Sequence, residues 1–525
     1  MPLVNLAPFK VPRRAAAAQV TQAAVISAPV GGLNYRDPIS NMQPTDALVL
    51  TNFIAKQQGV ELRKGYKTNT ETITHSINSI FGFKSPGQTK LFAAANGNIY
   101  DVTTNPAAVS QAATGSANNE WNTVMFSTPA RSFLLAVSPG AGYWTYDSTD
   151  GWVKRTVTNL PANPTSVNVW KQRVWFTAQN DQNVYYMDTV NAVTGSVTSF
   201  PMGSLLRNGG SVAAIINWTL DAGIGIDDHL VVVGTQGDVG VWQGTDPTSA
   251  NTFGLKGVWY VGPVPTKGTF YTPFGGDVMI LSESGLVPMS RLVNGQFIEQ
   301  QSGPASKIQE VLGPLIKRLR DTGYWNVFSV PSEDILVIQV PADGGTFRQY
   351  AMNVTTGAWS EFQGMPMRCS TILDGQLYFG TSDGLTYVGL TGNNDGALIN
   401  GTGGDSVVGE VQTAFQHFGT PANLKKFNMV KPLFISESQP QVKLRINVQF
   451  ASIDVGGSPA PFTNDVAYWN SAVWNTATWV GSKTYQAWFG VAALGYYGAI
   501  RMKVRGLPGT VFTASTLMME QGGMM

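Results

Sequence analysis

The chain has 525 residues, enough for several domains or for one large β architecture. Charged residues are only 13% of the chain, and its net charge is +1 because 34 basic residues nearly balance 33 acidic ones. A net charge so close to zero disfavours a protein that binds nucleic acid or a membrane surface mainly by electrostatic attraction. A single cysteine, Cys369, excludes an intramolecular disulfide framework, and the three scattered histidines disfavour a zinc centre. The histidines are His75, His229 and His417.

The N-terminal segment, residues 1–35, is predicted to be an arm. Three basic residues between positions 10 and 14 precede an alanine-rich stretch at 15–28. An export signal has a similar order, but here polar residues interrupt the apolar run, which contains no Leu or Phe. We expect an arm that orders against a partner, with a signal as the alternative. No window of about 18 apolar residues occurs, so a membrane-spanning helix and stable membrane insertion are not expected.

Past residue 70 the hydrophobic pattern is that of short strands. Runs of four to six residues rich in Val, Ile, Phe, Tyr and Trp alternate with turns of Gly, Asn, Asp and Pro, which predicts an all-β fold. The one good helix candidate is a helical insertion near 305–320, which Gly313 and Pro314 weaken. Its apolar face consists of Ile308, Val311, Leu312, Leu315 and Leu319.

A strand–turn–strand unit repeats along the chain. Its spacing is close to the ~40–50 residues of propeller blades, and an apolar first strand followed by an aromatic or β-branched second strand suits radial repetition. The repeat predicts an irregular β-propeller-like body over residues 36–390, with an array of β-sandwiches as the alternative. The seven copies begin at Leu91, Phe133, Val174, Val231, Val278, Ile335 and Leu377.

A Gly- and Asn-rich stretch, 391–405, is predicted to be a linker, and residues 406–525 an additional C-terminal β domain. Strict alternation over 442–448 predicts one face against a core and the other against water. Lys425, Lys426 and Lys431 suggest either phosphate contacts or protection of a strand edge. Four tryptophans suggest core packing and subunit contacts, or stacking of bases or sugars. They are Trp469, Trp474, Trp479 and Trp488.

Signatures of common chemistries are missing from the sequence. It contains no phosphate-binding loop, dinucleotide-binding fingerprint or H-E-x-x-H helix. A literal G-x-S-x-G string occurs at 380–384, but a nucleophile elbow needs a following helix and here a second strand follows. We therefore predict a hairpin turn, which also resembles the Asp-box turn of sialidase-type propellers with one residue missing.

Several isolated acidic and histidine side chains are candidates for a catalytic or metal site. Asp147, Asp150 and Asp188 follow predicted strands, where carboxylates could flank a glycosidic bond or simply form turns. His229 follows Asp227 and Asp228 and could be a metal ligand or base, or a solvated loop histidine. A turn-forming role is favoured for the aspartates and a solvated loop position for His229. No catalytic, cofactor-binding or metal residue is therefore assigned, and no enzymatic activity is expected.

Three segments resemble the N-terminal signature of the tail nozzle proteins of short-tailed bacteriophages. They are Gly-Gly-Leu-Asn-Tyr-Arg-Asp-Pro-Ile at 31–39, Asp-Ala-Leu-Val-Leu-Thr-Asn-Phe at 46–53 and Gly-Val-Glu-Leu-Arg-Lys-Gly-Tyr at 59–66. A looser similarity extends to 395–398 and 412–425. The resemblance implies a structural virion protein, assembled in the host cytoplasm, that forms a hexameric ring in the phage tail. It implies contacts with an adaptor (connector) protein and with tail fibres or tailspikes. The ring would retain packaged double-stranded DNA and conduct it during ejection.

A carbohydrate-binding or glycoside-cleaving β-propeller is the alternative, because low charge and Gly-rich β structure also suit secreted carbohydrate-binding proteins. That function predicts solvent-facing aromatic rings paired with carboxylates at the mouth of the propeller. The exposure of Trp144, Trp175 and Trp242 therefore bears on this alternative.

Overall fold

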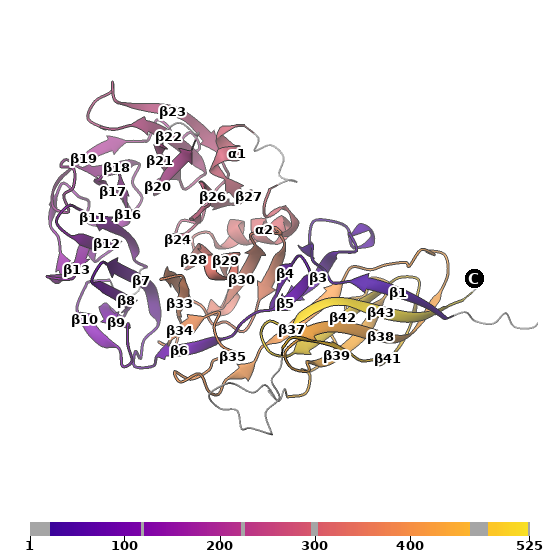
Figure 1. The fold of residues 1–525 in the computed structure, drawn as a ribbon. Coiled ribbons are helices and arrows are strands. Elements are labelled where there is room, and N and C mark those ends of the chain that lie inside the picture. The colour runs from indigo at the N-terminus through magenta and orange to yellow at the C-terminus, as the bar shows by residue number, and fades with distance from the viewer. Residues whose placement is uncertain (1–20, 117–119, 222–225, 296–302, 462–480, 523–525) are drawn as a thin grey trace, which may run out of the picture.

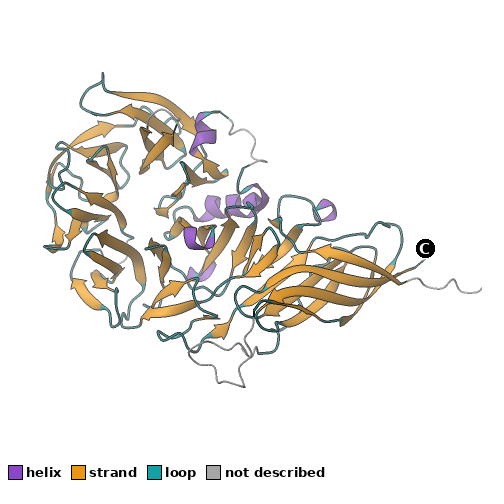
Figure 2. Cartoon of the chain, viewed as in Figure 1, coloured by secondary structure: helices purple, strands orange, loops and turns teal. Residues whose placement is uncertain are grey.

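The computed structural model describes residues 21–116, 120–221, 226–295, 303–461 and 481–522. Nearly all regular structure among them is β (Figure 2). A ring of small sheets stands beside an elongated β-sandwich that contains the C-terminal strand (Figure 1). The predicted all-β fold with a propeller and additional C-terminal β structure is confirmed.

Six separate sheets form blades of the ring. The first two contain β7 (Ile77–Ser85), β8 (Gln88–Ala95), β9 (Asn98–Asp101) and β10 (Ala108–Gln111), then β11 (Asn122–Ser127), β12 (Ser132–Ser138), β13 (Gly142–Asp147) and β14 (Gly151–Lys154). The third contains β15 (Val157–Thr158), β16 (Pro164–Trp170), β17 (Arg173–Ala178), β18 (Asn183–Met187) and β19 (Gly195–Pro201). The fourth contains β20 (Val212–Asp221), β21 (Ile226–Gly234), β22 (Asp238–Gly244) and β23 (Phe253–Tyr260), and the fifth β25 (Tyr271–Phe274), β26 (Asp277–Ser282) and β27 (Gly285–Pro288).

The ring is completed by a shared sector and a closing blade. The sector contains β28 (Trp325–Val330), β29 (Ile335–Pro341), β30 (Phe347–Asn353) and β31 (Trp359–Phe362), with the short β24 (Gly268–Thr269) parallel to β28. The closing blade contains β32 (Cys369–Leu373), β33 (Gln376–Gly380), β34 (Thr386–Gly389) and β6 (Tyr66–Thr70). Because β6 pairs with β34, the first propeller strand completes the last blade, and the chain enters and leaves the ring at one place.

Each of the seven predicted strand pairs is an antiparallel hairpin. The pairs are β8–β9, β12–β13, β17–β18, β21–β22, β26–β27, β29–β30 and β33–β34. Middle strands are covered on both faces by neighbouring sheets, which explains their continuous apolar runs: every residue of β17 and β29 is buried.

The predicted helix is present. A 3-10 turn, Ser306–Ile308, leads into α2 (Gln309–Leu319), which retains Pro314 in its interior. Ile308, Leu312 and Ile316 are buried in the largest core, and the other predicted apolar positions pack against it. Short helices lie elsewhere at α1 (Met289–Val293) and at the 3-10 turns Ile39–Asn41, Pro331–Glu333 and Asp343–Gly345.

The sandwich is built from both ends of the chain. Its seven-stranded sheet contains β1 (Thr21–Ser27), β4 (Phe53–Lys56), β5 (Gly59–Leu62), β38 (Lys425–Ser436), β40 (Lys483–Gln486), β41 (Phe489–Gly495) and β43 (Val511–Gln521). The facing strands are β2 (Gly32–Leu33), β3 (Asp46–Thr51), β37 (Val408–Thr413), β39 (Gln441–Val448) and β42 (Gly498–Arg505). These five facing strands, the propeller strands β28–β31 and the short β24 form one ten-stranded sheet, because β3 pairs with both β31 and β37.

The boundaries therefore differ from those expected from sequence. Residues 46–62, expected in the propeller, lie in the sandwich, because β3 pairs with β37 from the far end of the chain. Residues 21–27 of the expected arm form β1, which pairs along its whole length with β43. The propeller is thus inserted between two halves of a sandwich. Residues 1–20 lie outside the described residues.

The predicted linker 391–405 contains ordered contacts. A small bridge joins β35 (Asn394–Asp395) to β36 (Asp405–Ser406). Gly65, on the chain entering the propeller, lies so close to it that a Cβ there would be 2.0 Å from the Asn394 carbonyl oxygen. Side chains larger than glycine are therefore excluded at position 65.

Arg63 joins the two places where the chain passes between the sandwich and the propeller. Its side chain is fully buried and forms a two-fold hydrogen-bonded ion pair with Asp395, at 2.8 and 2.7 Å. The same guanidinium donates to the Asn52 side chain and to the carbonyl oxygens of Lys64 and Gln363, so it links four chain segments. Removal of one partner from a buried, hydrogen-bonded pair leaves the other uncompensated.

We expect Arg63→Ala to lower the free energy of unfolding by about 3 kcal/mol, because it leaves Asp395 without its cation in a mostly buried site. Chemical denaturation measures this change, and limited proteolysis should show new cleavage within 391–405. The matched control is Lys64→Ala: Lys64 pairs with Glu333 while 48% exposed, so its loss should cost under about 1 kcal/mol. Equal effects of the two substitutions would contradict this assignment.

Candidate functional site

The first strands of the blades surround a central cavity of about 1030 Å³. Its wall is largely made of amides, hydroxyls and backbone, with Asn122, Asn163, Asn180 and Asn326 among the lining residues. The charged lining residues are Lys267, Arg320, Arg368, Glu120 and Asp321. A concave, polar site of this size can hold a small polar molecule.

Four residues from consecutive sectors of the ring form a cluster on the cavity wall: Asn78, Glu120, Tyr324 and Arg368. The Tyr324 backbone N–H donates to the Glu120 carboxylate at 3.0 Å, and the Tyr324 hydroxyl donates to the Asn78 side chain at 3.2 Å. Arg368 donates to the same hydroxyl and lies over the Tyr324 ring, 3.9 Å from its centroid. The cluster spans the junction at which the propeller closes.

Tyr324 has a φ of +72°, an unfavourable conformation for a bulky residue. Its backbone N–H is held by Glu120, and its carbonyl oxygen accepts from the Gln339 side chain at 3.0 Å. A Cβ on the preceding Gly323 would lie 2.4 Å from a Glu120 carboxylate oxygen, so a side chain there would displace that carboxylate. The surrounding contacts therefore hold the strained backbone in place.

Glu120 has an unusual protonation equilibrium. Burial in the wall raises the pKa of its carboxyl to about 7, while the Tyr324 N–H and the charges of Lys267 and Arg368 act in the opposite direction. Desolvation is the largest of these effects. Glu120 therefore changes charge near neutral pH, and the sequence offered no local signal for it.

None of the three candidate aspartates is among the residues that line the cavity. Asp147 is buried and accepts the backbone N–H groups of Thr149 and Asp150, at 2.8 and 2.9 Å. Asp150 pairs with Arg131 at 2.6 Å. Asp188 accepts from the hydroxyls of two residues in its own blade, Ser196 and Thr198. The turn interpretation is confirmed for Asp147, whereas Asp150 forms an ion pair and Asp188 bonds side chains of the neighbouring strand β19.

His229 lies within β21 and is fully buried, so the expectation of a solvated loop histidine was wrong. The ring packs against Trp218, and its Nε2 is 3.2 Å from the Lys256 ammonium nitrogen. Asp228 pairs with Lys171 at 2.9 Å. The Asp227 side chain lies outside the described residues. The strand extends further toward the N-terminus than its polar residues indicated.

The lysines of β38 serve different purposes from those expected. Lys425 is fully buried and donates to the carbonyl oxygens of Thr420, Asn423 and Tyr496, while desolvation lowers its pKa. Lys431 lies over the Trp488 ring. Protection of a strand edge was the wrong explanation, because β38 has paired neighbours on both sides.

The tryptophans examined for exposure pack inside the propeller. Trp144, Trp175 and Trp242 are all buried, so none presents a ring at the mouth of the cavity. Trp488 is 43% exposed. Trp469, Trp474 and Trp479 lie outside the described residues.

The remaining motifs form ordinary structural contacts. The 380–384 string is the turn between β33 and β34, as predicted. Burial raises the pKa of the Cys369 thiol to about 12. Among the described ranges, no three His, Cys, Asp or Glu side chains group as metal ligands. No helix in the described part of the chain is long and apolar enough to cross a membrane.

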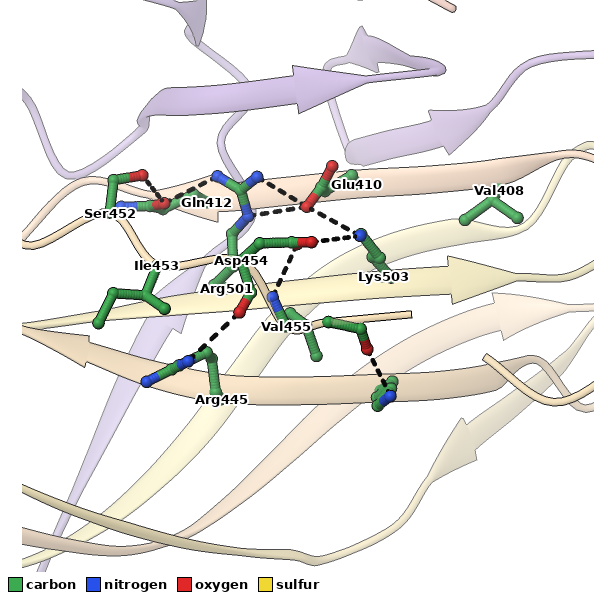
Figure 3. A network of polar contacts seen from close by, with 12 residues as sticks. Val408, Glu410, Gln412, Arg445, Ser452, Ile453, Asp454, Val455, Arg501 and Lys503 are labelled. Carbon is green, nitrogen blue, oxygen red and sulfur yellow. Dashed lines mark hydrogen bonds and ion pairs between the residues drawn. The ribbon is translucent and has the colours of Figure 1, made fainter. Parts of the chain in front are cut away.

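A polar network covers one face of the sandwich (Figure 3). Arg501 donates twice to Glu410, at 2.9 and 2.7 Å, and once to Gln412 at 2.9 Å. Lys503 pairs with Asp454 at 2.9 Å, which holds the loop after β39 over the sheet. The face of β39 expected to meet water is thus partly covered, and Asn447 within it is 1% exposed.

The segment that resembles nozzle proteins also has structural contacts. Gly32 has a φ of +74°, and a Cβ there would lie 2.6 Å from the Trp359 backbone. Asn34 is buried and donates to Asp46 at 2.6 Å. Lys307, beside α2, donates to the same carboxylate and to the Gly31 carbonyl oxygen, both at 2.8 Å. These residues join the N-terminal strands to the propeller.

Comparison with known proteins finds no matching family model and no matching curated protein. Two solved structures that resemble the chain are the computationally designed Ika8 protein and the WD40 β-propeller domain of Doa1. The first has 13% identity and a TM-score of 0.36, and covers 62% of this chain and 100% of its own. The second has 10% identity and a TM-score of 0.39, and covers 62% and 96%.

Glu120→Gln should alter the pH dependence of stability. Because the carboxyl pKa is raised on folding, the folded protein binds more protons than the unfolded one between about pH 4.5 and 7, so stability falls as pH rises through this window. Glutamine can still accept the Tyr324 N–H and has no charge. We expect the variant to lose this decline and to exceed the wild type above pH 7, by at most about 3 kcal/mol. Parallel pH profiles of the two proteins would contradict the assignment.

Proposed function

We propose that the protein is a structural subunit of the tail of a short-tailed bacteriophage. Several copies, six in the simplest case, form a nozzle ring below an adaptor protein. The ring continues the DNA channel, retains the packaged genome and conducts it during ejection. Tail fibres or tailspikes attach to its outside.

The observation that carries this proposal is the role of the signature segment in the fold. Gly32, Asn34 and Asp46 lie at the junction of the N-terminal strands with Trp359 and Lys307. In a family of structural proteins, we expect the shared sequence signature to consist of residues that fix the packing of the fold. The buried Arg63, in the third part of the same signature, ties the propeller to the sandwich in the same way.

The charge balance supports a conduit for DNA. Each phosphate contact made by a Lys or Arg adds affinity through counterion release, so a basic channel would hinder transit. With 34 basic and 33 acidic residues the chain has no general excess of positive charge to line a pore. The axial channel in this proposal runs between copies and is separate from the cavity inside each propeller.

The test is retention of DNA by tail-less particles. Capsids filled with DNA and carrying portal and adaptor, but lacking this protein, should release their genome into a nuclease-accessible form. Addition of the purified protein should restore protection, because the ring closes the channel. The free subunit should show no measurable binding to duplex DNA at physiological salt. The control is the same protein after heat denaturation.

Failure to restore protection, together with absence of the protein from intact particles by mass spectrometry, would overturn the proposal. A ring whose axial channel is lined mainly by lysine and arginine would also contradict it.

A carbohydrate-binding propeller is the second candidate, favoured by the polar central cavity. Asn163 and Asn180, which line it, offer amide donors and acceptors of the kind that sugars bind. Calorimetric titration with a panel of oligosaccharides tests this function. Saturable binding that Asn163→Ala abolishes would favour it over the tail role.

A further inference from the structure

The seven-stranded sheet of the sandwich has two open edges among the described residues. Its central part runs in the order β1, β43, β38, β41, with β40 continuing the edge of β41 (Figure 1). Among the strands that the structure describes, β1 pairs only with β43, and β41 only with β38. Unpaired backbone groups along such strands are available to another strand.

Both edge strands lack the charges and prolines by which proteins prevent a sheet edge from pairing with another strand. β1 reads Thr-Gln-Ala-Ala-Val-Ile-Ser and β41 reads Phe-Gly-Val-Ala-Ala-Leu-Gly, so neither contains a charge or a proline. Val25 on β1 is 69% exposed and Leu494 on β41 is 59% exposed. Two outer strands of the propeller blades, by contrast, contain a lysine: Lys154 in β14 and Lys256 in β23.

The directions of the strands allow the sheet to continue into a second copy. All three pairings are antiparallel, so β1 and β41 run in opposite directions. A neighbour in the same orientation would therefore place its β1 antiparallel to β41 of the first copy. Identical orientation of neighbours is what a head-to-tail contact in a cyclic ring requires.

The two edges also lie at the same level of the sheet. Thr21 pairs with Glu520, Glu520 with Lys426, and Lys426 with Leu494. At the other end Ser27 pairs with Ala514, Ala514 with Leu433, and Leu433 with Gln486 on β40. β41 therefore lies level with residues 21–24 of β1, and the same edge continues through β40 as far as Ser27. Beyond Ser27, β5 and β4 occupy the β1 side of β43, so the matching part of the two edges is β1 against β41, with no shift along the strands.

We propose that β1 of one copy pairs with the β41 edge of the next copy, joining their seven-stranded sheets head to tail. The partner is a second copy of this chain. The contact needs only self-association of the purified protein, so it can hold even if the role in a phage tail does not.

Disulfide trapping tests the contact. Ala23→Cys is placed on β1, and Gly490→Cys, Ala492→Cys and Leu494→Cys in turn on β41, so that three registers are sampled. The native Cys369 should contribute little, because its thiol donates to the Ile77 carbonyl oxygen and its pKa is raised to about 12, so the reactive thiolate is scarce. Under mild oxidation, a mixture of the β1 variant with one β41 variant should give a covalent dimer. Each variant alone should give none, because the contact is between different edges.

Assembly is then measured by light scattering of variants with a charged edge. Val25→Lys and Leu494→Lys should each weaken self-association at least about tenfold without changing the unfolding midpoint, because a charge opposes strand addition at an edge. Leu255→Lys is the control, since Leu255 on β23 is 45% exposed and lies outside the proposed contact.

Three results would overturn the proposal: a monomeric wild-type protein, a covalent dimer formed by one variant alone, or no cross-link at any of the three positions. Loss of both assembly and cross-link on deletion of residues 1–20 would also overturn it, because that segment would then hold the copies together.

Discussion

The structure depends on a fully buried guanidinium at the place where the chain passes between its two bodies. Arg63 follows the last N-terminal strand of the sandwich and precedes β6, while its partner Asp395 follows the last propeller strand, β34. The ion pair therefore fixes the entry of the propeller to its exit. Hydrogen bonds to Asn52 and to the Gln363 carbonyl oxygen add the neighbouring strands β3 and β31.

Two strand pairings and one cluster of side chains also hold the junctions of the chain together. The pairing of β6 with β34 closes the ring, and the pairing of β3 with β31 and β37 extends one sheet from the propeller into the sandwich. The cluster around Tyr324 then joins consecutive sectors across the ring closure. These contacts hold the chain together at the closure of the ring and at the junction between the propeller and the sandwich.

The sequence predicted local structure well and distant pairing poorly. The seven hairpins and the helix at α2 follow from periodicity, because each is determined by residues close together in the chain. The membership of β3 in the sandwich could not be predicted, since its partner β37 lies at the other end of the chain and apolar alternation does not specify a partner. Arg63 likewise belongs to the segment that resembles nozzle proteins, but nothing near it in sequence identifies Asp395.

At the candidate site, too, local contacts could be predicted from sequence and contacts between distant residues could not. That Asp147 would bond the backbone of a turn could be predicted from its position at the end of a strand, whereas the contacts of Asp188 with the hydroxyls of β19 could not. Glu120 could not be identified, because its raised pKa arises from burial against residues of distant sectors. His229 was misjudged because the polar residues before it suggested a loop, whereas they belong to the strand β21.

Propeller and sandwich should unfold as one cooperative unit despite the insertion of one within the other. Differential scanning calorimetry of the isolated subunit measures this cooperativity. We expect a single transition whose calorimetric and van't Hoff enthalpies agree, because unfolding of either body breaks the shared sheet and the Arg63 contacts. Two separate transitions, with one body remaining folded after the other has unfolded, would contradict it.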